Sequence, residues 1–207
     1  MQLEMRQKTS AVRLVEVLAT EKFDSPATWV TPMNIGGFNI VYRLQVEGFS
    51  FEIIVRRPIS CWAQFPEEKT LIEASIANYI EKQTQIPIVP VFFQRNISEL
   101  GYYLIIKYIE YYYSMAFVFN ATNDDNSKPF VLDPNISEDF LEEFYRKVAS
   151  CLLELWQYTF SCIGSLVESS EGSFSVAACP IICDINDMLQ LTCILSSIFL
   201  QGRRYLG

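Results

Sequence analysis

The chain contains no histidine, which limits the catalytic and metal-binding chemistry that its side chains can perform. Histidine is the commonest proton carrier at neutral pH and a common zinc ligand, so catalysis and metal sites that depend on it are excluded. The six cysteines are scattered, with none in a Cys-x-x-Cys pair. We therefore expect no metal site. Since the first ten residues carry charges and no apolar run, they do not resemble a secretory signal, and we expect reduced thiols in a cytoplasmic protein.

Positive charge is also scarce, with 16 lysines and arginines against 24 acidic residues and a net charge of -8. A nucleic-acid-binding protein usually presents a basic face, and an anionic membrane surface attracts basic segments, so both partners are disfavoured. Residues 187–200 are apolar, but the run is too short and too interrupted to span a membrane. Half of the residues are hydrophobic, which is the composition of a folded protein.

The hydrophobic pattern predicts an α+β protein with an antiparallel sheet. Helices are expected at 10–22, at 66–83 and from Ser137 onward, and strands within 29–55, 91–93 and 102–109. Ile72, Ile76, Tyr79 and Ile80 form the expected buried stripe of the second helix. An apolar stripe along the third helix, including Phe144, Leu152 and Trp156, predicts a core-facing side. The expected divisions are an N-terminal helical extension (1–28), a sheet lobe with a hinge (29–119), a linker (120–136) and a partial helical lobe (137–207).

A glycine turn between two strands is the most informative local feature. Gly36, Gly37, Phe38 and Asn39 follow one apolar strand and lead into the next, and Arg56 lies near the end of a third. Glycine has no Cβ, so the backbone can approach a phosphate closely, and a neighbouring cation can neutralise the phosphate charge. Because side chains alternate along a strand, Ile54 and Arg56 are expected on one face. The alternative is a plain hairpin turn.

Several ordered motifs resemble the aminoglycoside phosphotransferase family, in particular its fungal branch, which has a protein-kinase-like fold. The glycine turn continues as Ile40-Val41-Tyr42-Arg43-Leu44, and the later motifs follow in the family's order. These are Leu71-Ile-Glu-Ala-Ser75, Thr84-Gln-Ile-Pro-Ile-Val-Pro90, Leu104-Ile-Ile-Lys-Tyr-Ile109, Phe160-Ser-Cys-Ile-Gly-Ser-Leu166 and Asp184-Ile-Asn-Asp-Met-Leu-Gln-Leu191. The similarity spans residues 29 to about 195 and implies a kinase-like N-lobe joined to a partial helical C-lobe.

The resemblance implies a nucleotide site. Arg56 takes the position of the family's phosphate-clamping cation, and Glu73 that of the helix carboxylate that holds this cation. Lys107 and Ile109 fall in the hinge that connects the lobes, and ATP is the implied ligand. Arginine in place of the usual lysine is a departure, although its planar fork also binds phosphate. The alternative for Arg56 and Glu73 is an ordinary surface ion pair.

Catalysis is not expected from this chain alone. The family's H-x-D loop cannot be present in its usual form without histidine, and no residue set is expected to bind Mg²⁺. Asp184 and Asp187 lie in a segment that resembles one upstream of that loop. The sequence thus predicts a truncated, inactive phosphotransferase-like protein, a pseudoenzyme that binds nucleotide weakly. The alternative is a non-catalytic interaction module whose apolar segment 187–200 docks a protein partner.

Overall fold

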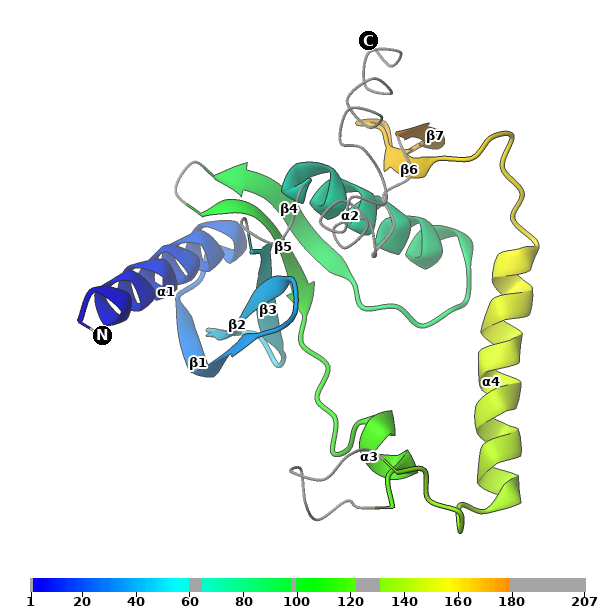
Figure 1. The fold of residues 1–207 in the computed structure, drawn as a ribbon. Coiled ribbons are helices and arrows are strands. Elements are labelled where there is room, and N and C mark those ends of the chain that lie inside the picture. The colour runs from blue at the N-terminus through cyan, green and yellow to red at the C-terminus, as the bar shows by residue number, and fades with distance from the viewer. Residues whose placement is uncertain (1, 60–64, 98–99, 122–130, 179–207) are drawn as a thin grey trace, which may run out of the picture. The chain divides into compact units, whose positions relative to one another are not determined.

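The computed structural model describes residues 2–59, 65–97, 100–121 and 131–178, which form two compact units (Figure 1). One unit contains the described residues up to Tyr108 together with those from Phe160 onward, and the other runs from Ile109 to Thr159. The apolar segment 187–200, Asp184 and Asp187 lie outside the described residues. No helix in the described part of the chain is long and apolar enough to cross a membrane.

The first unit is built on a five-stranded antiparallel sheet in the order β1-β2-β3-β5-β4. Its strands are β1 (Ala27–Ile35), β2 (Asn39–Val46), β3 (Glu52–Pro58), β4 (Val91–Ile97) and β5 (Gly101–Lys107). Gly48 adopts a φ of +83° at the reversal between β2 and β3, a conformation that glycine adopts without steric cost. The predicted α+β class with an antiparallel sheet is confirmed.

The main core lies between one face of this sheet and α1 (Gln2–Phe23). Val15, Leu18 and Ala19 of α1 are buried in it. The sheet contributes alternate residues of its three central strands: Tyr42, Leu44, Val46, Ile53, Val55, Tyr103 and Ile105. Full burial of one such side chain contributes about 1.5–3 kcal/mol. The helix expected at 10–22 begins earlier, at Gln2. Because its apolar residues are buried against the sheet, it belongs to the main core and not to a separate extension.

The opposite face of the sheet carries α2 (Pro66–Gln83), which begins with Pro66 and an acidic first turn, as predicted. A two-stranded hairpin of β6 (Ser165–Glu168) and β7 (Phe174–Ala178) packs on α2 (Figure 1). This hairpin was expected within the partial helical lobe at 137–207. It belongs instead to the sheet unit, because Glu168 binds side chains of α2.

The second unit contains α3 (Met115–Phe119) and α4 (Glu138–Trp156). The Ser137 hydroxyl accepts a hydrogen bond from the Phe140 N–H, which confirms the predicted start of the long helix. Phe119 of α3 packs against Phe144, with ring centroids 5.1 Å apart.

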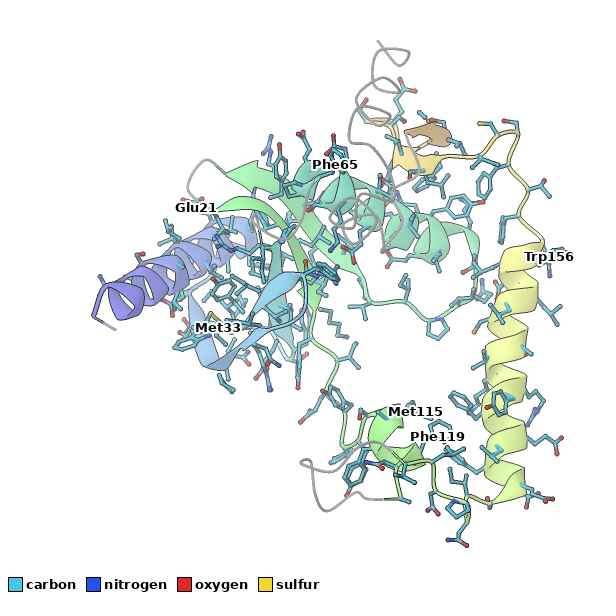
Figure 2. The ribbon with its side chains drawn as sticks, viewed as in Figure 1. Glu21, Met33, Phe65, Met115, Phe119 and Trp156 are labelled. Carbon is cyan, nitrogen blue, oxygen red and sulfur yellow. The ribbon has the colours of Figure 1, made fainter. Side chains whose placement is uncertain are left out.

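The predicted core-facing stripe of α4 is wrong in this structure, since no residue of the helix is buried. Leu152 is 62% exposed and Trp156, at the end of the helix in Figure 2, is 85% exposed. The physical reason is that the aromatic contacts described for this unit lie near the N-terminal part of α4. The other apolar side chains of α4 have few packing partners within the second unit.

Candidate functional site

Arg56 lies on the face of the sheet that α1 does not cover. In the strand register it stands between Val41 and Leu104, while Ile54 stands between Arg43 and Ile106. Residues that oppose one another in neighbouring strands point to the same side of a sheet. Their neighbours Ile53 and Val55 are fully buried on the α1 side, so Ile54 and Arg56 share the opposite face, as predicted from the alternation.

Glu73 of α2 forms an ion pair with Arg56 through Oε1 and the guanidinium Nη2. The structure therefore brings together the two charged residues that the motifs singled out. The side chains are 25% and 40% exposed, respectively. A pair this accessible contributes only about 0–1 kcal/mol to folding. A guanidinium carries five N–H donors, so a single carboxylate contact does not exhaust its hydrogen-bonding capacity.

The glycine turn joins β1 to β2 at the end of the sheet nearest Val41, the neighbour of Arg56 in the register. The Gly36 N–H donates to the Asn39 carbonyl at 2.9 Å, and the Ile59 N–H donates to the Phe38 carbonyl at 2.9 Å. Neither Gly36 nor Gly37 has a left-handed φ, and a Cβ on Gly37 would meet no atom within 4 Å. The hairpin itself therefore does not require glycine at these positions.

A second cation stands beside the turn and was missed by sequence reasoning. The Lys69 ammonium lies 5.2 Å from the ring centroid of Phe38. Lys69 precedes Glu73 by one helical turn of α2, a spacing that puts both side chains on one face of the helix. This spacing is the signal that could have identified Lys69.

Lys107 does not join Arg56. It stands opposite Ile53 in the register, and its ammonium lies 5.1 Å from the ring of Phe51, which packs against the main core. The alternation of β5 therefore directs this side chain to the α1 side of the sheet. Ile109 is 49% exposed and belongs to the second unit.

The hinge end of the Arg56 face holds a different set of residues. The Arg43 guanidinium lies 3.9 Å from the ring centroid of Tyr108 and is paired with Glu52. The Tyr108 N–H donates to the Glu52 carbonyl at 2.9 Å, which extends the pairing of the two strands. Val41, Ile54 and Ile106 form a half-buried apolar strip on this face, in which Val41 stands next to Arg56 and Ile54 next to Arg43 in the register.

Groups that could bind a metal are not gathered at this face. Within residues 2–59, 65–97, 100–121 and 131–178, no three Asp, Glu or Cys side chains lie close enough together to hold a metal ion. On the other face of the sheet, burial raises the pKa of Tyr42 and of Tyr103 above the ordinary value of 10.0.

Comparison with known proteins adds no family assignment: no protein-family model matches the sequence, and no curated protein is significantly similar to it.

Proposed function

We propose that the sheet unit is the nucleotide-binding lobe of a phosphotransferase-like, kinase-like protein and that it binds ATP without catalysing transfer by itself. The observation that carries the proposal is the contact between Arg56 on β3 and Glu73 on α2, on the α2 side of the sheet next to a glycine turn. A β-strand cation held by a helix carboxylate is the arrangement that clamps nucleotide phosphates in kinase-like proteins.

Each part of this face has a role in the proposal. Arg56 donates hydrogen bonds to phosphate oxygens, and Glu73 holds the guanidinium in place. Gly36 and Gly37 leave room for the phosphates beside the backbone. The apolar strip of Val41, Ile54 and Ile106 offers half-buried apolar side chains for contact with the base.

The family that the motifs resemble uses an H-x-D loop for phosphoryl transfer, and the chain has no histidine for that loop. Loss of a general base alone lowers a rate by about 10²- to 10⁴-fold. Binding is therefore the activity that these residues support best.

A thermal-shift titration with Mg-ATP tests the proposal. A ligand at 100 times its Kd stabilises a protein by about 2.7 kcal/mol, so saturating Mg-ATP is expected to raise the melting temperature measurably. The shift is expected to disappear in Arg56→Ala and to persist in Arg146→Ala, a matched control because Arg146 pairs with Glu143 on exposed α4. No shift in the wild type, or an equal shift in Arg56→Ala, would contradict the proposal.

The exposed apolar side of α4 favours a second candidate, a non-catalytic interaction module. Trp156 and Leu153 are 85% and 67% exposed, and clusters of large exposed apolar residues mark interfaces or aggregation-prone surfaces. A stable one-to-one complex with another protein, combined with no nucleotide-dependent shift, would favour this candidate over the first.

A further inference from the structure

Glu168 of the β6–β7 hairpin contacts three side chains of α2. Its carboxylate accepts a hydrogen bond from Asn78 Nδ2 at 2.6 Å and pairs with the Lys82 ammonium. Its backbone N–H donates to the Ser75 hydroxyl at 3.2 Å. The Glu168 side chain is only 14% exposed. Because Ser75, Asn78 and Lys82 recur at helical spacing, Glu168 contacts one continuous side of α2.

Aromatic contacts extend the same attachment. The Phe174 ring meets the edge of Tyr79 at 5.2 Å between centroids, and the Lys82 ammonium lies 5.3 Å from the Phe174 centroid. Phe160, which precedes the hairpin, contacts Tyr79 from 5.8 Å. α2 is thus held between the sheet and the hairpin.

The Arg56–Glu73 pair cannot by itself fix the position of α2, since an ion pair of this exposure contributes about 0–1 kcal/mol. Glu73 lies within one turn of Ser75 on the same helix. Any shift or fraying of α2 at the hairpin contacts therefore moves or loosens the carboxylate that orients Arg56.

We propose that Glu168 is a positioning residue for the phosphate site: it anchors α2 so that Glu73 stays beside Arg56. This inference rests on the proposed nucleotide binding. The β6–β7 hairpin, although distant from Arg56 in the sequence, thereby affects the affinity of the sheet for nucleotide.

Amide hydrogen exchange of the full chain, with ATP binding measured by calorimetry, tests the inference. In Glu168→Gln, which keeps the size of the side chain but loses its charge, we expect about tenfold faster exchange in α2, because charged hydrogen bonds are lost. We also expect ATP affinity to fall. Glu171→Gln is the control, because Glu171 lies exposed in the same hairpin. Asn78→Ala removes one of the two carboxylate contacts and serves as a milder variant if Glu168→Gln does not fold.

A combined variant separates positioning from general stability. If Glu168 acts through Glu73, the loss of affinity caused by Glu168→Gln should vanish in a Glu73→Gln background; a merely structural role would cost the same in both. Exchange in α2 no faster than in Glu171→Gln, or faster exchange with unchanged ATP affinity, would overturn the inference. If the wild type does not bind ATP, the proposed function fails, whereas the exchange of α2 still decides whether Glu168 anchors the helix.

Discussion

The Arg56–Glu73 pair allows a prediction in which protein stability and ligand affinity respond differently to the same substitutions. The Arg56 and Glu73 side chains are 25% and 40% exposed, so their mutual attraction is screened by water. Double-mutant cycles on accessible pairs usually give 0–1 kcal/mol. We therefore expect Arg56→Ala, Glu73→Gln and the double variant each to lower the free energy of unfolding by no more than about 1 kcal/mol.

The effect on ATP affinity should be larger. A hydrogen bond from a guanidinium to a phosphate contributes about 1.5–3 kcal/mol, because both partners are charged. At about 1.4 kcal/mol per tenfold change in Kd, Arg56→Ala should weaken binding by about 10- to 150-fold. Glu73→Gln should weaken binding less, since it loosens Arg56 but also removes a negative charge near the phosphates. Added to Arg56→Ala, it should cause no further loss.

Urea unfolding and calorimetric titration with ATP measure the two quantities on the same samples. Arg146→Ala, alone and with Glu143→Gln, provides a matched exposed pair and should leave the ATP affinity unchanged. The reasoning is refuted if Arg56→Ala lowers stability by several kcal/mol while affinity stays within twofold of the wild type. That outcome would make Arg56 a structural residue and the pair an ordinary feature of the fold.

Three further predictions concern other parts of the chain. Gly36→Ala and Gly37→Ala should unfold within about 0.5 kcal/mol of the wild type, because an added Cβ would make only an ordinary contact with the Asn39 carbonyl at Gly36 and none within 4 Å at Gly37. Gly48→Ala, at a φ of +83°, should cost about 1 kcal/mol, and denaturant unfolding compares the three variants. Burial raises the pKa of Glu168, but the hydrogen bonds from Lys82 and Asn78 and the Lys82 charge outweigh it and lower the pKa below 4.5. The contribution of Glu168 to stability should therefore be complete above pH 4.5 and disappear as the pH falls through the lowered pKa of the folded state. Glu168→Gln should flatten the pH dependence of the free energy of unfolding in that range. Trp156→Ser should reduce the binding of a hydrophobic dye without lowering the melting temperature, because the side chain is 85% exposed, and an unchanged dye signal would locate the apolar surface elsewhere.

Local pattern was enough to predict the sheet and the side of it on which Arg56 lies. Alternation along β3 separates Ile54 and Arg56 from Ile53 and Val55, because one face must be buried. The same rule, applied to β5, would have placed Lys107 on the buried side, but only once its register with Ile53 is known. Register is a property of the pairing between strands, which the sequence of one strand does not contain.

Contacts between distant segments were beyond sequence reasoning. Lys82 and Glu168 are separated by 86 positions, and neither belongs to a recognisable motif. The prediction that Ile76 lies in the buried stripe of α2 is wrong, since it is 40% exposed, whereas Ser75 is buried and accepts a hydrogen bond from the Glu168 N–H. A helix that is covered on one side should show a single apolar stripe in its sequence. In contrast, α2 packs against the sheet on one side and makes polar contacts with the hairpin on another.

The distribution of charge decides what kind of phosphate recognition this face can offer. The chain carries a net charge of -8, and Glu67 and Glu68 share the first turn of α2 with Lys69, so no broad positive field draws an anion toward the site. At physiological salt, charges more than about 8 Å away are largely screened, and the distant acids matter little once a ligand is bound. In the proposed nucleotide site, affinity for phosphate must then come from short-range donors, above all the Arg56 guanidinium. Because the Arg56 guanidinium is paired with Glu73, its position depends on how firmly α2 is anchored.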